Sequence, residues 1–79
     1  LREAAARIAA GEREFRALER WAVQALEGEG LRPDYVSVRR QRDLVEAEAA
    51  DQDLVLLAAA WLGRARLIDN IELRLNDAA

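Results

Sequence analysis

The sequence predicts an α+β fold in which two N-terminal helices precede a small three-stranded antiparallel sheet. Residues 1–27 repeat their apolar positions every three or four residues, which is typical of amphipathic helices. From residue 34 onward the period shortens toward two, which is typical of strands. In addition, Gly63-Arg64 separates two apolar segments, and a glycine in first place suits the type II′ turn of a hairpin at 63–64.

The helical part divides at a glycine. A first helix is expected over residues 1–10, and Gly11 is expected to end it at a positive φ. A second helix is expected over residues 12–27, with Glu12 and Glu14 in its first turn, where the helix dipole favours negative charge. A Gly-Glu-Gly cluster follows directly and is expected to stop this helix.

The remaining chain alternates between apolar segments and polar connections. A strand is expected over residues 34–39, with Val36 and Val38 on one side, and the polar residues that follow should leave the sheet. Residues 46–53 read as a solvated acidic connection. This region therefore predicts one short strand and a long charged loop.

Residues 54–62 are nine apolar residues in a row, a pattern shared by buried helices and central strands. Val55 and the glycine that follows the run favour a strand, whereas its three consecutive alanines favour a helix. The segment 65–75 alternates apolar and polar residues as a strand. We expect these two long strands to be antiparallel neighbours, with the strand at 34–39 on one edge and the second helix over one face.

Composition excludes several classes of chemistry. The 79 residues form one domain, 52% hydrophobic and 34% charged, which suits a globular fold. They include no His, Cys, Met or Lys, so zinc clusters, Cys nucleophiles, Ser-His-Asp triads and Schiff-base lysines cannot form within the chain. No apolar stretch approaches the roughly 20 residues that span a bilayer, so no membrane partner is expected and cytoplasm is the expected location. The missing methionine favours a fragment of a longer protein.

Two charged segments invite a ligand but are better explained as solvated surface. The run from Arg39 to Arg42 could hold phosphates, because arginine forks bind them bidentately. A net charge of −3 and a pI near 4.9 oppose a nucleic-acid partner, and the interpretation we favour is a solvated turn. The acidic connection lacks the glycine and the terminal bidentate Glu of a calcium loop, so we predict no metal site.

Two tryptophans and three polar residues of the last predicted strand are candidates for an interface. Trp21 and Trp61 are either core aromatics or boundary residues, because a buried indole N–H needs a partner. Arg66, Asp69 and Asn70 interrupt what otherwise reads as a core strand. Locally, Arg66 would pair with Asp69 while the carboxylate or amide satisfies backbone groups. Functionally, the three would face a neighbouring domain or a ligand, and periodicity alone favours the local interpretation.

The wording of the C-terminal third resembles a known family. LLAAAWLGRARLIDNIEL, residues 56–73, is similar to the carboxy-terminal end of pantothenate synthetases, also called pantoate–β-alanine ligases. RPDYVSVRRQRDL, residues 32–44, is similar to the preceding strand of that family. The helical part matches the family in length and apolar pattern but contains few residues that are characteristic of it. The resemblance covers nearly the whole chain.

The resemblance implies a role within a larger enzyme. Such ligases activate pantoate with ATP, assisted by Mg²⁺, to pantoyl adenylate, which β-alanine converts to pantothenate with release of AMP. It implies that residues 1–79 correspond to the C-terminal lid domain, that the N-terminal catalytic domain is its partner, and that the whole enzyme is a cytoplasmic homodimer. Catalytic, cofactor-binding and metal-binding residues would then lie outside this chain, and the isolated chain would be inactive. It also favours an interdomain role for Arg66, Asp69 and Asn70.

A second class of function remains open from the residues. The chain would then be a free-standing α+β interaction module that binds a partner protein at its surface. The coding region upstream distinguishes the two hypotheses. A His-x-Gly-His motif more than a hundred residues before Leu1 would support the ligase, whereas an initiator methionine immediately before Leu1 would support the module.

Overall fold

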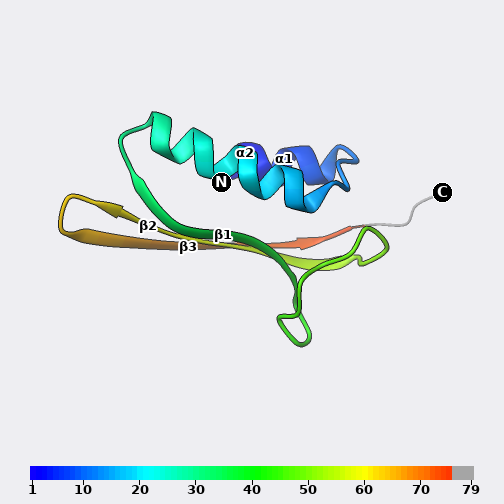
Figure 1. Ribbon diagram of the computed structural model, residues 1–79. Coiled ribbons are helices and arrows are strands. Elements are labelled where there is room, and N and C mark those ends of the chain that lie inside the picture. Colours follow the sequence, from blue (N-terminus) through cyan, green and yellow to red (C-terminus); the bar gives the residue numbers. More distant parts are fainter. Residues whose placement is uncertain (76–79) are drawn as a thin grey trace.

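The computed structural model describes residues 1–75 and has two layers, helices on a sheet (Figure 1). The elements follow in the order α1 (Arg2–Ala9), α2 (Phe15–Gly28), β1 (Arg32–Arg40), β2 (Asp53–Leu62) and β3 (Ala65–Arg74). The three strands form one antiparallel sheet in the order β1-β2-β3. The predicted α+β fold is therefore confirmed, and the nine-residue apolar run is a central strand.

The junction between the helices differs from the prediction. Gly11 does have a positive φ, 117°, but α2 begins at Phe15, three residues later than expected. The acidic residues before it are not in its first turn, because the Glu12 carboxylate accepts the Glu14 N–H, 3.0 Å away, within the connection. Arg13 donates from one terminal nitrogen to the carbonyls of Ile8 and Glu12, at 2.8 and 2.9 Å. These local bonds compete with helical ones and delay the helix.

The end of α2 follows the predicted glycine cluster closely. Gly28 is the last helical residue, and Gly30 adopts a φ of 85°, which a residue with a Cβ rarely takes. The Leu31 N–H then bonds back to the Leu26 carbonyl at 3.0 Å and satisfies a carbonyl that the helix leaves free. This turn reverses the chain and directs β1 beneath the helix from which it came.

The hairpin between β2 and β3 lies at the predicted corner. Leu62 pairs with Ala65, which leaves Gly63 and Arg64 as the two loop residues. Gly63 has a φ of 59°, whereas Arg64 does not have a positive φ. A type II′ turn requires this combination, because only its first central residue has a positive φ. Pairing continues without a shift as far as Asp53 and Arg74.

Strand β1 is longer than predicted and contains an irregularity. It begins at Arg32, two residues earlier than expected, and ends at Arg40, one residue beyond the predicted end at residue 39. The register against β2 shifts between Pro33 and Tyr35, so Asp34 is an extra, bulged residue. A bulge of this kind turns a side chain away from strict alternation.

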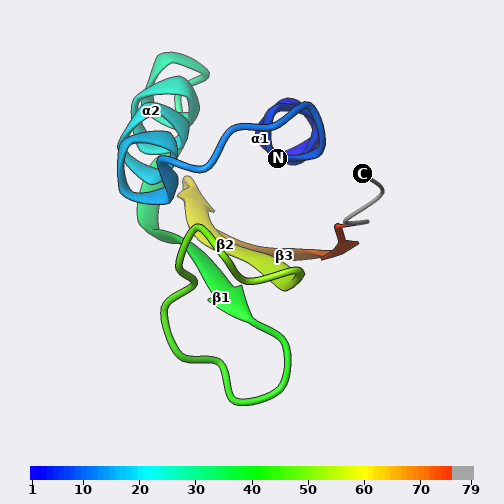
Figure 2. The same cartoon turned by 90° about the vertical axis from the view of Figure 1, so that its right-hand side faces the viewer.

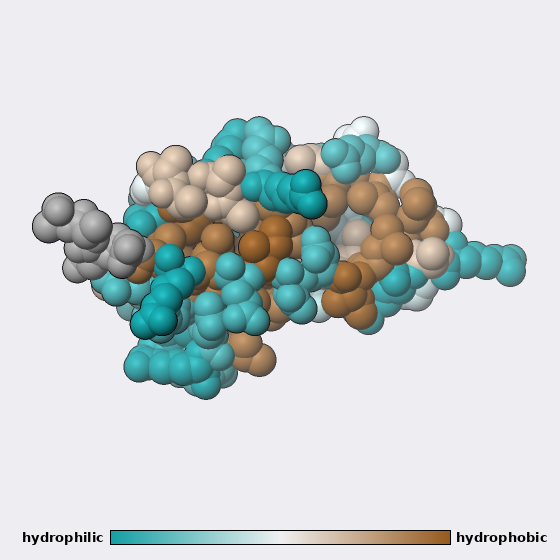
Figure 3. Space-filling view, turned by 180° about the vertical axis from the view of Figure 1, so that it is seen from behind, coloured by the Kyte–Doolittle hydropathy of each residue, from teal (hydrophilic) through white to brown (hydrophobic). Residues whose placement is uncertain are grey.

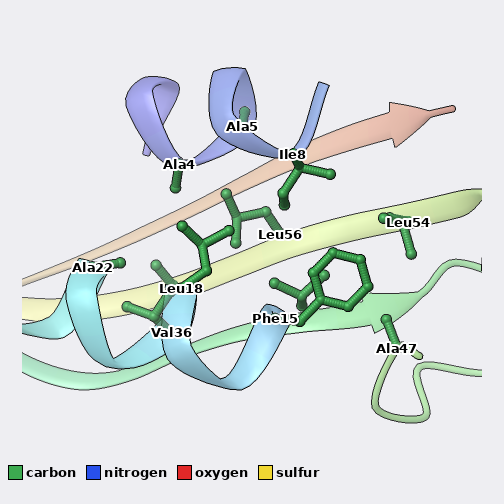
Figure 4. Packing of buried hydrophobic residues seen from close by; sticks show 12 residues of the cluster. Ala4, Ala5, Ile8, Phe15, Leu18, Ala22, Val36, Ala47, Leu54 and Leu56 are labelled. Atoms are coloured by element: carbon green, nitrogen blue, oxygen red, sulfur yellow. The ribbon is translucent and has the colours of Figure 1, made fainter. Parts of the chain in front are cut away.

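The core lies between the helices and one face of the sheet. Figure 2 shows α2 above β1 and α1 above the β3 side, and Figure 4 shows their side chains meeting those of the central strand. Ile8, Phe15 and Leu18 from the helices pack with the fully buried Leu54 and Leu56 of β2. Other members of this cluster are Ala4, Ala5, Ala22, Val36, Val38, Ala47 and Ala58.

Polar side chains of α2 also fasten it to the outer edge of β1. The Glu19 carboxylate accepts the Val38 N–H at 2.7 Å. Arg16 donates from Nη2 to the carbonyls of Val38 and Ala47, at 3.2 and 3.3 Å. Its Nη1 lies 3.0 Å from a Glu46 carboxylate oxygen, a charge contact without hydrogen-bond geometry. The backbone N–H and carbonyl of Val38 on this edge are thus used, which hinders pairing with another strand at this residue.

The helices cover only one face of the sheet (Figure 1). Part of the connection between β1 and β2 extends to the other side, although Ala47 within this connection returns to the core. Strict alternation along β2 places Val55, Leu57, Ala59 and Trp61 on that second face, because their neighbours Leu54, Leu56 and Ala58 join the core. We call this surface the helix-free face. Neither helix within residues 1–75 is long and apolar enough to cross a membrane.

Candidate functional site

Strand β3 carries the predicted site residues and is an exposed edge strand, not a core strand. Ala65 to Asn70 are all exposed, and only Ile71, Leu73 and Leu75 pack partly against the core. The helix α1 is eight residues long and lies over part of the strand, so the hairpin end extends beyond it. Viewed from behind, hydrophobic surface continues from beneath α1 to the hairpin end (Figure 3).

The three predicted site residues do not form one cluster. Arg66 pairs in register with Trp61, and Asn70 with Leu57, so both lie on the helix-free face. Asp69 pairs with Ala58 and lies on the helix side. The structure therefore brings Arg66 and Asn70 to one face and places Asp69 on the other.

Arg66 has a partner that the sequence did not indicate. Its Nε donates to Oδ2 of Asp34 at 3.0 Å, across the width of the central strand. The predicted Arg66–Asp69 pair is wrong, because alternation along a strand sends residues three positions apart to opposite faces. Asp69 instead accepts the N–H of Asn70 at 2.9 Å, so the expectation that it satisfies a backbone group is confirmed.

The bulge in β1 makes this contact possible. Asp34 is the residue without a partner in the β1–β2 register, and its carboxylate reaches Arg66 on β3. Both side chains remain about two-fifths exposed, at 40% and 41%. The pair thus links the two outer strands of the sheet while leaving polar atoms accessible at the surface.

The two tryptophans have different environments. Trp21 packs partly against the core from α2, with the Arg7 guanidinium 3.9 Å from its ring centroid. Trp61 lies on the helix-free face, outside the core cluster, with Arg32 at 6.0 Å. Trp21 is thus a core-side residue, whereas Trp61, half-buried between two arginines in register, has the character of a boundary residue.

The arginine run at the end of β1 is engaged within its own loop. Arg40 donates to both carboxylate oxygens of Asp43, at 2.6 and 3.2 Å, and Arg39 donates to the Leu44 carbonyl at 3.0 Å. The pKa of Asp43 lies below its usual range, first because the Val45 N–H donates to it and then because Arg40 does. The same hydrogen bond from Arg40 raises the pKa of the Arg40 guanidinium. These contacts favour the interpretation as a solvated turn.

No metal-binding group is found where the structure describes the chain. Within residues 1–75, no three carboxylates come close enough together to hold a metal ion. Asp51 instead accepts the Glu48 N–H at 2.8 Å, which closes a turn in the acidic connection.

Sequence reasoning missed Asp34, Tyr35 and Ile68 as surface residues of interest. Tyr35 and Ile68 flank Ala59 in register on the helix-free face, and they are 42% and 65% exposed. The available signal was the strand period of two, which places residue 35 opposite the side of Val36 and Val38. Nothing in the local sequence announces a bulge at Asp34, apart from the proline before it.

A model of the pantoate-beta-alanine ligase family matches residues 1–72. The chain belongs to this family. It is 54% identical to the pantothenate synthetase of Thioalkalivibrio sulfidiphilus over 71 residues, which are 90% of this chain and 25% of that protein. It is 51% identical to the pantothenate synthetase of Methylococcus capsulatus over 76 residues, 96% of this chain and 27% of the relative. A relative from Pseudomonas fluorescens is 51% identical over 72 residues, 91% of this chain and 25% of that protein.

Membership of the pantoate–β-alanine ligase family agrees with the resemblance of residues 32–44 and 56–73, since the match includes the first segment and all but the last residue of the second. The chain spans about a quarter of the length of the curated relatives that it matches. Asp34, Arg66, Asp69 and Asn70 all fall within the matched range.

Proposed function

We propose that this chain is the C-terminal lid domain of a pantoate–β-alanine ligase. The support is the combination of a family match over residues 1–72 with a chain that spans about a quarter of its relatives. The absence of histidine and lysine from all 79 residues adds to this, because any histidine general base and any phosphate-binding lysine must then come from elsewhere. This composition is consistent with a lid domain that encloses the active site and leaves the catalytic groups to another domain.

The reaction of the whole enzyme would proceed in two steps. A carboxylate oxygen of pantoate attacks the α-phosphorus of ATP, and the bond to pyrophosphate breaks. The amine of β-alanine then attacks the carbonyl carbon of pantoyl adenylate, loses a proton and displaces AMP. The mixed anhydride between the steps is open to hydrolysis, so a lid that excludes water protects it.

Within this lid we assign Arg66 and Asn70 to the boundary with the catalytic domain. They lie on one face of an exposed edge strand, and Arg66 is held by Asp34 with part of its guanidinium accessible. A preorganised, accessible arginine suits a contact with carboxylates or backbone carbonyls of a neighbouring domain. Asp69, which lies on the helix side, is the weakest of the three candidates.

The test is isotope exchange between pyrophosphate and ATP in the longer enzyme that contains this chain. We expect exchange that requires pantoate but not β-alanine, and AMP as the nucleotide product once β-alanine is added. The 79-residue chain alone should support no exchange. Exchange by the chain alone would contradict the lid assignment, and formation of ADP would contradict the adenylate mechanism.

A further inference from the structure

The helix-free face of the sheet lacks the cover that its composition calls for. An antiparallel sheet with one face in water alternates apolar and polar residues along its strands. Strand β2 does not alternate, because every residue from Leu54 to Leu62 is apolar. The helices bury the side of Leu54, Leu56 and Ala58, yet the opposite side is equally apolar. A central strand that is apolar on both faces is typical of a sheet covered on both faces.

The neighbouring strands extend this apolar strip. Tyr35 on β1 and Ile68 on β3 stand in register on either side of Ala59, whose own exposed fraction is 1%. The two large side chains thus close over the small one between them and form an exposed apolar surface, on which an apolar side of another element can pack. The largest exposed apolar side chain of the strip is Ile68, at 65%.

The connection between β1 and β2 adds a second, independent observation. Leu44 is half-exposed and has a φ of 59°, a conformation that is costly for a leucine. It lines a shallow pocket of about 160 Å³ with Val55 and Glu72, both on the helix-free face. The backbone is thus strained in a way that presents an apolar side chain at the border of this face.

Polar residues surround the strip as they do in interfaces between domains. The Arg66–Asp34 pair lies near the hairpin end, and Arg39 with Glu72 lies at the other end, in register on either side of Val55. At the outer edge of β1, the backbone N–H and carbonyl of Val38 are already bonded by Glu19 and Arg16 of α2.

We propose that the helix-free face packs directly against the catalytic portion of the same polypeptide when the lid is closed. This rests on the proposed lid function. The occupant is the remainder of the enzyme, because the curated relatives are about four times as long as the segment matched here. The accessible apolar side chains of the strip, Tyr35, Leu57 and Ile68, are the centre of the contact. Arg66 and Asn70 lie within its polar border.

Adjacent residues of β3 supply a matched test. Ile68 and Leu67 are both exposed apolar residues, at 65% and 48%, but they lie on opposite faces. Each is replaced by cysteine (Ile68→Cys, Leu67→Cys) in the longer enzyme, in a background from which any cysteines outside this chain have been removed. Labelling with N-ethylmaleimide is timed with saturating ATP and pantoate, without β-alanine, so that the enzyme is held at the adenylate stage. Circular dichroism verifies that both variants are folded.

We expect labelling of Ile68→Cys to be at least about tenfold slower than that of Leu67→Cys, because the rate is limited by the open fraction of the lid. Equal rates in an enzyme that still catalyses pantoate-dependent exchange would overturn this inference and leave the proposed function standing. Protection of Ile68→Cys that disappears on dilution would point to a second copy as the occupant and would also overturn it. Absence of exchange in the unsubstituted enzyme would overturn the proposed function and this inference with it.

Discussion

Replacing Arg66 by glutamine separates an interdomain role from a purely structural one. The Arg66 Nε lies 3.0 Å from Asp34, and the side chains are 41% and 40% exposed. Exposed ion pairs contribute about 0.2–1 kcal/mol to the free energy of unfolding. With an unfolding entropy of roughly 2.1 cal/mol/K per residue, the loss of 1 kcal/mol would lower the Tm of a chain of this size by about 6 °C. Arg66→Gln should therefore lower the Tm of the 79-residue chain by at most that amount.

Asp34→Asn is the matched control, because it removes the same ion pair but keeps the guanidinium. Both variants should lose similar stability in thermal unfolding followed by circular dichroism. In the longer enzyme, Arg66→Gln should also lower kcat by about tenfold or more, since a hydrogen bond to a charged group contributes about 1.5–3 kcal/mol. Asp34→Asn should keep kcat within about twofold, because the interdomain contact of Arg66 would remain. An unchanged kcat for Arg66→Gln, together with a lower Tm, would refute the interdomain role and leave only the link between strands.

Three further substitutions test the fold in the 79-residue chain. Leu56→Ala should lower the free energy of unfolding by about 2–5 kcal/mol in guanidinium titrations, because Leu56 is fully buried beneath both helices. Leu57→Ala on the helix-free face should lower it by less than half as much. Equal losses would mean that the second face is also buried. Gly63→Ala should lower the free energy of unfolding by about 1–2 kcal/mol in the same titrations. The cause would be backbone strain at a φ of 59° and not a steric clash, because no atom lies within 4 Å of the added Cβ. An unchanged midpoint would argue against the turn geometry. Asp43→Asn should lower the Tm at pH 6, and this difference should shrink as the pH falls below about 3.9, the pKa of an unperturbed aspartate. A carboxyl whose folded pKa is lowered stabilises the fold above its unfolded pKa and loses this effect as the pH falls through the folded pKa; a difference in Tm that is independent of pH would contradict this contribution.

Local signals in the sequence predicted the order and type of every element. The change of period near residue 34, the glycines after each helix and the Gly63-Arg64 corner are each readable within a few residues. The strand identity of residues 54–62 was ambiguous, because an apolar run has no period. The start of α2 was wrong by three residues, since bonds from Glu12 and Arg13 within the connection replace the first helical turn.

The details of the candidate site depend on contacts between residues distant in the sequence. Arg66 and Asp34 are 32 residues apart, and they meet only because a bulge shifts the register of β1. The bond from Val38 to Glu19 joins strand and helix in the same way. Which face Arg66, Asp69 and Asn70 occupy follows from alternation, once a single core residue such as Leu56 has been placed. That placement requires the structure, because β2 is apolar on both sides.

The ratio of AMP to pantothenate formed tests the covering role most directly. A charge placed on the helix-free face by Ile68→Asp should weaken closure of the longer enzyme, because an exposed apolar contact would become a buried, unpaired carboxylate. Water would then reach the adenylate, and AMP should accumulate in excess over pantothenate, whereas the unsubstituted enzyme should form one of each. One AMP per pantothenate at an unchanged kcat in Ile68→Asp would contradict the role of this face as the inner side of a lid.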